Sequence, residues 1–142
     1  MLVREKRLYH RLQVAAHCLQ KTADREIGSR LDITTAQAAV LSVLTNREGT
    51  THKEIADALG FNQSAVTAMI NRLISLDYVA RVRNPKDGRS WILQMTPEGT
   101  QALERTRSPF SKVNGKISDT LDDDEILALS QSLEKLIRAF RT

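Results

Sequence analysis

The chain has 142 residues, of which 41% are hydrophobic and 27% charged, an ordinary composition for one soluble domain with a buried core. Only 4% of the residues are aromatic, which argues against a stacking surface for single-stranded nucleic acid. The net charge of +4 favours an anionic partner, and the single cysteine, Cys18, excludes an intrachain disulfide.

The sequence lacks the patterns of a secreted or membrane-spanning protein. Met1 to Lys6 is charged, and no apolar segment typical of a signal peptide follows it. No apolar run approaches the roughly 20 residues that a membrane-spanning helix needs. We therefore expect a cytoplasmic protein with no membrane partner.

The segment from Leu8 to Arg30 is predicted to form one long helix. Apolar residues recur there every three or four positions and share one side of such a helix. They are Leu8, Leu12, Ala15, Leu19, Ala23 and Ile27. A long helix with one apolar side needs a partner surface, either in this chain or in another copy of it.

Two shorter helices are expected next, and each begins with a capping box. In Thr34–Gln37 the threonine hydroxyl can accept from the glutamine backbone N–H, while the glutamine side chain reaches back to the cap. This helix should end near Asn46. Thr51–Glu54 is a second box, and Gly60 can adopt the left-handed conformation that ends the helix it opens.

The helix expected from Asn62 to about Asp77 has two contrasting sides. One side is apolar, with Val66, Met69, Ile70, Leu73, Ile74 and Leu76. The other side is small or polar and has no acidic member, so it can enter a DNA groove without repelling phosphates. Its residues are Gln63, Ser64, Thr67, Ala68, Asn71 and Arg72.

A basic hairpin is predicted after this helix. Val79–Arg83 and Trp91–Met95 read as two strands, and Pro85 and Gly88 mark the loop between them. The charged residues of the hairpin are Arg81, Arg83, Lys86, Asp87 and Arg89. This excess of cations suits contacts with phosphates and the minor groove, although charges also protect exposed strand edges.

Two residues of the hairpin each have two interpretations. Asp87 can hold the Arg89 guanidinium by a charge-assisted hydrogen bond, or it can serve the turn before Gly88, and both can hold together. Trp91 is interpreted as the residue that packs under the hairpin, with the wall of a ligand pocket as the alternative.

The remainder of the chain is expected to be helical. Thr96 caps a helix with Pro97 in its first turn, and Pro109 and Gly115 should kink or interrupt the helix. Asp122–Glu125 is typical of the start of a last helix. Apolar residues run along that helix to its end, so both ends of the chain are apolar-striped helices.

The order and spacing of these motifs resemble the MarR family of bacterial transcriptional regulators over nearly the whole chain. The motifs are Ile33–Gln37, Ile55–Gly60, Ser64–Thr67, Asn71–Leu73, Asp87–Ser90 and Leu93–Gly99. The resemblance implies a mainly α fold with a small β-hairpin wing. A winged helix-turn-helix unit at 33–97 is expected, with dimerisation helices at 1–32 and 98–142, in a single domain spanning 1–142 and without a cofactor.

The resemblance also assigns site residues. It implies base-edge contacts in the major groove from one side of the recognition helix, a phosphate contact from Arg72, and a minor-groove arginine, Arg89, oriented by Asp87. The complete predicted DNA-binding set is Gln63, Ser64, Thr67, Ala68, Asn71, Arg72, Arg83, Lys86, Asp87 and Arg89. Ala65 and Ala68 depart from the family pattern, which implies fewer direct base contacts and a thymine methyl as partner for Ala68.

The expected function is that of a homodimeric regulator of transcription, a repressor on a pseudo-palindromic double-stranded DNA operator. A small, aromatic acid-like molecule in the cleft between the dimer helices and the winged unit is the candidate effector. This last expectation rests on the resemblance alone.

The residues allow three other interpretations. Cys18 is a candidate redox sensor, although we interpret it as a buried small hydrophobic residue. A winged-helix protein-interaction module would need an exposed apolar patch on the recognition helix. Paired carboxylates, a nucleophile motif and a metal cluster are all missing from the sequence, so we expect no enzyme, and His10, His17 and His52 are interpreted as ordinary histidines.

Overall fold

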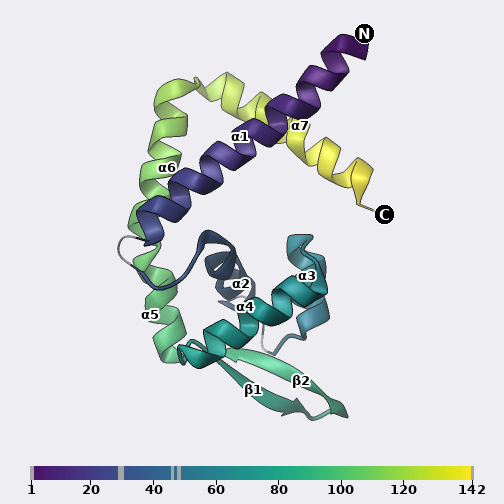
Figure 1. The fold of residues 1–142 in the computed structure, drawn as a ribbon, viewed down its shortest axis with the longest axis vertical. Helices are drawn as coiled ribbons and strands as arrows, with labels where there is room; N and C mark the ends of the chain where they lie inside the picture. The colour runs from purple at the N-terminus through teal and green to yellow at the C-terminus, as the bar shows by residue number, and fades with distance from the viewer. Residues whose placement is uncertain (1, 29–30, 46, 48, 142) are drawn as a thin grey trace.

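The computed structural model describes residues 2–28, 31–45, 47 and 49–141 (Figure 1). The elements are α1 (Leu2–Gly28), α2 (Thr35–Thr45), α3 (His52–Leu59), α4 (Gln63–Ser75), β1 (Val79–Asn84), β2 (Asp87–Met95), α5 (Pro97–Arg105), α6 (Arg107–Thr120) and α7 (Asp123–Phe140). Arg30 and Asn46, where two helices were expected to end, lie outside the described residues, as do Met1 and Thr142. The predicted mainly α fold with one antiparallel hairpin is confirmed.

The core lies in the winged unit, by which we mean α2, α3, α4 and the β1–β2 hairpin. Side chains from all three helices and from β2 are fully buried together: Val40, Leu41, Ile55, Val66, Ile70, Leu73 and Leu93. Burying one such side chain stabilises a fold by about 1.5–3 kcal/mol. This cluster therefore fixes which side of α4 remains at the surface.

Capping bonds set the helix ends of the winged unit. The first capping box forms completely: the Gln37 N–H donates to Thr34 Oγ1 at 3.2 Å, and the Thr34 N–H donates to Gln37 Oε1 at 3.0 Å. At α3 the Glu54 N–H donates to Thr51 Oγ1 at 3.1 Å, while the Glu54 carboxylate accepts from the Thr51 hydroxyl. Gly60 ends α3 with φ of 67°, which glycine adopts without strain.

The hairpin is longer than predicted and is anchored at its root. Its strands extend to Asn84 and begin again at Asp87. Thr50 forms an antiparallel bridge with Leu93, in which the two backbone N–H groups donate across distances of 3.3 and 2.8 Å. The segment before α3 is thereby tied to the base of β2.

The turn from α4 into β1 departs slightly from prediction. α4 ends at Ser75, before the expected Asp77, because Asp77 adopts φ of 62° and turns the chain into β1. Gly99 in α5 packs so closely against this turn that a Cβ there would collide with the Tyr78 carbonyl oxygen. The sequence motif that ends at Gly99 therefore has a steric reason for its glycine.

The segment after α5 was predicted only in part. The helix breaks at Thr106, and Pro109 lies in the first turn of α6, where its missing N–H is tolerated. The expected interruption at Gly115 was wrong, since α6 runs continuously from Arg107 to Thr120. α7 begins as predicted: Asp122 and Glu125 form a complete capping box.

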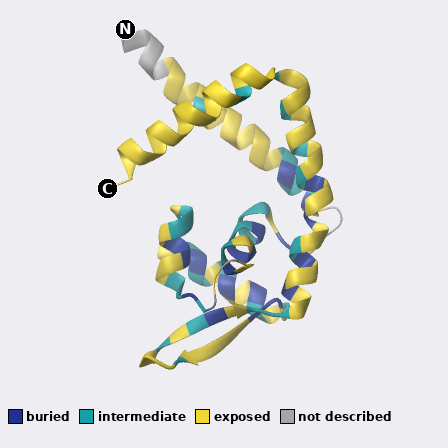
Figure 2. Ribbon diagram, turned by 180° about the vertical axis from the view of Figure 1, so that it is seen from behind, coloured by how far each residue is buried: buried dark blue, intermediate teal, exposed yellow. Residues whose placement is uncertain are grey.

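The flanking helices, by which we mean α1, α6 and α7, extend away from the winged unit and are mostly exposed (Figures 1 and 2). α1 packs on α6, with Lys112 Nζ 3.6 Å from the Glu26 carboxylate, but its described side chains are buried only at Ala23 and Ile27. α7, which is described throughout, has no buried residue. The large exposed apolar residues on α1 and α7 are Leu8, Tyr9, Val14, Leu19, Leu127, Leu129, Leu133, Leu136, Ile137 and Phe140. Among the described residues, no helix has the length and apolar character needed to cross a membrane.

Candidate nucleic-acid interface

One side of α4 forms an exposed polar surface, which we call the recognition ridge. It consists of Gln63, Ser64, Thr67, Ala68, Asn71 and Arg72. Asn62 begins α4, with its Oδ1 accepting from the Ser64 N–H at 2.9 Å. All ridge residues are exposed except Thr67, which is half-buried. The structure thus brings six of the predicted site residues together on one surface.

Two ridge hydroxyls donate their protons to acceptors within the protein. Ser64 Oγ donates to Asn62 Oδ1 at 2.7 Å, and Thr67 Oγ1 donates to the Gln63 carbonyl at 3.0 Å. A hydroxyl has one proton and two lone pairs, so each of these oxygens retains the capacity to accept from a donor. In a major groove, the amino groups of adenine and cytosine are the base-edge donors that match a lone pair.

His52, the first residue of α3, lies beside the ridge. Its Nδ1 is 3.2 Å from Thr67 Oγ1. Burial lowers the pKa of His52, and the positive charge of Arg81 on β1 lowers it further. From the sequence alone, His52 is an ordinary histidine. The capping box predicts its place at the start of α3, but the sequence does not predict its contact with Thr67 of α4.

The wing, by which we mean the β1–β2 hairpin, carries a stack of two arginines on Trp91. The Arg83 and Arg81 guanidinium carbons lie 4.6 and 5.6 Å from the centre of the Trp91 ring. Arg83 Nη1 also donates to the Gly88 carbonyl at 2.7 Å. The Arg83 side chain is therefore held in place by an aromatic face and a hydrogen bond.

The prediction that Trp91 packs under the hairpin is corrected by this geometry. Trp91 is 40% exposed, because the hairpin at this point extends beyond the helical core (Figure 1). The Arg81 and Arg83 guanidinium groups lie over its ring.

The loop of the wing is ordered by side-chain bonds to its backbone. Asp87 Oδ1 accepts from the Arg89 N–H at 3.1 Å, and Asn84 Oδ1 accepts from the Lys86 N–H at 3.0 Å. Asp87 thus has the turn role that was one of its two interpretations. Within the described part of the chain, the ion pairs do not include one between Asp87 and the Arg89 guanidinium.

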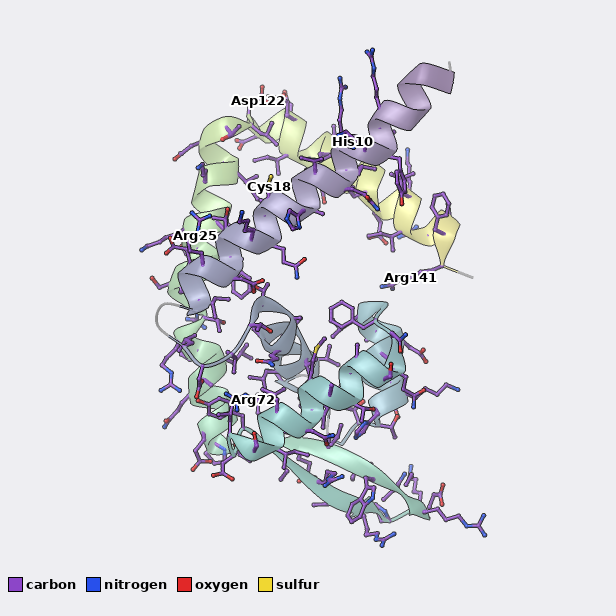
Figure 3. The ribbon with its side chains drawn as sticks, in the orientation of Figure 1. His10, Cys18, Arg25, Arg72, Asp122 and Arg141 are labelled. Atoms are coloured by element: carbon purple, nitrogen blue, oxygen red, sulfur yellow. The ribbon has the colours of Figure 1, made fainter. Side chains whose placement is uncertain are left out.

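The ridge and the wing lie at the end of the molecule opposite α1 and α7 (Figure 1). Arg72, labelled on α4 in Figure 3, is exposed, as are the three other predicted cations Arg83, Lys86 and Arg89. Between Gln63 and Met95 the sequence has only two acids. A polar ridge beside exposed cations is complementary to the surface of a double helix.

A separate cleft of ≈ 540 Å³ lies between α2 and α6. Its lining is Thr35, Ala38, Ala39, Ser42, Val43, Arg47, Leu59 and Phe110. Thr35 Oγ1 is buried without a hydrogen-bond partner in the described residues. A largely apolar wall with one guanidinium suits a small molecule that has an apolar body and an anionic group.

The histidines and the cysteine that were candidates for a metal site or a redox site do not form a cluster. His10 and His17 are exposed on α1, far along the chain from His52, and the described residues contain no group of three potential metal ligands. Cys18 was expected to be buried, but it is exposed and lines an apolar groove of ≈ 460 Å³ between α1 and α6. The physical reason is that α1 is covered only at its C-terminal end within one chain.

Two helices joined by a tight turn, with a β-hairpin beside the second, define a winged helix-turn-helix protein. The sequence profile of the MarR family matches residues 31–90. The chain is 31% identical to the HTH-type transcriptional repressor MdtR of Bacillus subtilis, over 78% of this chain and 71% of MdtR. It is 30% identical to the transcriptional activatory protein BadR of Rhodopseudomonas palustris, over 93% of this chain and 75% of BadR.

The chain belongs to the MarR family and is a transcriptional regulator of that type, not an enzyme. Among solved structures it is similar to the transcriptional repressor CouR bound to a 23-mer DNA duplex. The two share 27% identity, a TM-score of 0.84 and coverage of 92% of each chain.

Proposed function

We propose that this chain is a homodimeric repressor that binds a pseudo-palindromic double-stranded DNA operator in the cytoplasm and releases it in response to a small molecule. The observation that carries the proposal is the acid-free recognition ridge on α4 beside the exposed cations of the wing. Residues 33–97 would form the DNA-binding unit, and residues 1–32 and 98–142 would pair the two copies.

The ridge and the wing have different roles in this proposal. Gln63, Ser64, Thr67, Ala68 and Asn71 face base edges in the major groove, and Arg72 contacts phosphate. Arg89 enters the adjacent minor groove, while Arg83 and Lys86 contact the backbone and Asp87 shapes the loop. The fixed hydroxyls of Ser64 and Thr67 support this division, since they offer lone pairs alone.

Homodimerisation is supported by the exposed apolar surface of the flanking helices. Leu129 is 46% exposed and Phe140 82% exposed, and both lie on the apolar stripe that runs along α7. Contiguous apolar patches of this kind mark interaction surfaces. A second copy supplies the same patch, so the pair is closed by two-fold symmetry.

The symmetry sets the geometry of the operator. Two recognition ridges related by a two-fold axis require half-sites about 10–10.5 bp apart, or a multiple of that spacing. CouR, whose solved structure is similar, is bound to a 23-mer duplex, and this length accommodates two such half-sites. CouR and MdtR are named as repressors, which supports the sign of regulation proposed here.

The effector is proposed to bind the cleft between α2 and α6. Arg47 suits the carboxylate of an aromatic acid-like molecule, and the apolar wall suits its ring. The cleft joins the winged unit to a flanking helix, so a ligand there can favour one spacing of the two ridges. The ligand can shift the spacing only if it binds the two arrangements with different affinities.

The exposed Cys18 favours a second candidate, thiol redox control. Cys18 lies in the groove between α1 and α6, within the surface proposed to pair the copies. An oxidised thiol there would place a polar group in an apolar contact. Peroxide sensitivity of duplex binding that disappears in Cys18→Ser would favour this candidate over ligand control alone.

Selection of bound duplexes from a random pool tests the proposal. The expected product is a pseudo-palindrome, bound by two copies of the chain. Addition of aromatic acids to the recovered duplex should release it, and Arg47→Ala should weaken that response. Recovery of no sequence-specific duplex, or of an asymmetric site bound by one copy, would contradict the proposal.

A further inference from the structure

His52 is a titratable side chain at the edge of the recognition ridge, and the proposed function gives it no role. Its Nδ1 lies 3.2 Å from Thr67 Oγ1, and Arg81 is the charged neighbour that acts on it. The three residues come from α3, α4 and β1. His52 therefore lies where the ridge and the wing meet.

The hydrogen-bond directions around Thr67 define which nitrogen of His52 donates. Thr67 Oγ1 gives its proton to the Gln63 carbonyl, so the proton between Thr67 and His52 must come from Nδ1. A neutral His52 then has a lone pair on Nε2, whereas a protonated one has an N–H there. Only the protonated ring can hold Thr67 and donate to an anion at the same time.

The charges around His52 favour an anion. Arg81 acts on it from β1, and among the described residues the ion pairs include none between Arg81 and a carboxylate. α4 presents the neutral Thr67. On α3 itself Lys53 follows His52, and the Glu54 carboxylate is engaged by two threonine hydroxyls. A phosphate between His52 and Arg81 would remove the repulsion between two cations.

We propose that His52 is a proton-dependent phosphate ligand: with Arg81 it binds a DNA phosphate through Nε2–H, while Nδ1–H holds Thr67 in position. Duplex binding then takes up one proton at each His52. This inference rests on the proposed DNA-binding function and adds a contact residue and a pH dependence to it.

The sign of the pH dependence follows from linkage. Burial and Arg81 lower the pKa of His52 in the free protein, and a bound phosphate raises it in the complex. Duplex affinity is therefore greatest below the free-protein pKa and falls as the pH rises through the pKa of the complex. Each unit between these two pKa values corresponds to about a tenfold change in the dissociation constant for each His52 that binds a phosphate.

The first test measures this dependence by fluorescence anisotropy, with the full chain and the duplex recovered from selection. Between about pH 5.5 and 8.5, the wild-type dissociation constant should rise about threefold to tenfold per histidine. His52→Gln keeps an N–H for Thr67 but cannot titrate, so its dissociation constant should stay nearly flat. The matched control His17→Gln, exposed on α1, should retain the wild-type dependence.

The second test needs no variant. NMR titration of the histidine ring protons, with and without the duplex, should show the pKa of His52 rising in the complex. An unaltered His52 pKa, or a pH dependence that persists in His52→Gln, overturns the inference and leaves DNA binding intact. A chain that binds no duplex at any pH overturns the proposed function and this inference together.

Discussion

The winged unit and the flanking helices bury their apolar residues to very different extents. In α4 the apolar side is covered within the chain, and Val66, Ile70 and Leu73 are each 0% exposed. In α7 an equally regular stripe leaves Leu133 36% exposed and Phe140 82% exposed. The winged unit is therefore complete in one chain, whereas the flanking helices have an apolar surface that one chain does not cover.

A charge placed on the apolar stripe of α7 is expected to have the largest effect. Leu133→Glu should prevent pairing, because an unpaired carboxylate in an apolar contact is costly. Operator affinity should fall by about 10²–10⁴, the gain that comes from linking two binding units. Sedimentation would report the oligomeric state, and anisotropy would report affinity for the selected duplex.

Gln131→Glu is the matched control for this change. It adds the same charge to the same helix, on the side opposite the apolar stripe, and should leave both pairing and affinity near wild type. If Leu133→Glu bound the operator as tightly as Gln131→Glu, pairing through α7 would be wrong.

A substitution in the wing should weaken DNA binding and leave the pairing of the two copies unchanged. Arg89→Ala should cost about 1–3 kcal/mol of specific binding, by analogy with a lost base-edge arginine, while pairing is unaffected. Trp91 is the only tryptophan in the sequence, so its fluorescence can report whether the wing still meets the duplex. Normal operator affinity in Arg89→Ala would contradict the minor-groove role.

Arg72→Ala should produce a smaller and less selective loss. A phosphate contact carries no sequence information, so selected and random duplexes should weaken alike, by about 1 kcal/mol or less. The slope of log affinity against log salt should decrease by about one. A loss confined to the selected duplex would instead indicate that Arg72 reads bases.

Local chemistry explains which parts of the fold were predictable. The complete capping boxes at Thr34 and Asp122 formed because each needs only residues three positions apart. The 3.6-residue period likewise identified the buried side of α4. These features depend on neighbours along the chain, so a single sequence contains them.

Features that depend on distant residues were not predictable. The contact between His52 and Thr67 joins two helices across a turn, and the stack of Arg83 on Trp91 depends on where the wing leaves the core. The apolar stripe of α1 was found, but periodicity alone could not indicate that only its last part is buried. A pattern identifies an apolar face without identifying what covers it.

The smallest effect is expected from removing Arg141, the residue that follows α7. Its side chain makes the one hydrogen bond to α3 from this end of the chain among the described residues. Arg141 Nη2 donates to the Ala58 carbonyl at 3.4 Å, near the C-terminal end of α3, where a positive charge is favourable (Figure 3). Because Arg141 is exposed and the bond is long, Arg141→Ala should change operator affinity by less than about 1 kcal/mol.

Hydrogen exchange can detect this coupling where affinity barely changes. The Phe61 N–H donates to the Ala56 carbonyl at 3.0 Å and closes the end of α3, so it should exchange faster in Arg141→Ala. Arg138→Ala is the matched control, since Arg138 is paired with Glu134 on α7 itself at 3.1 Å. Equal exchange at Phe61 in both variants would mean that α7 and the winged unit are independent at this contact.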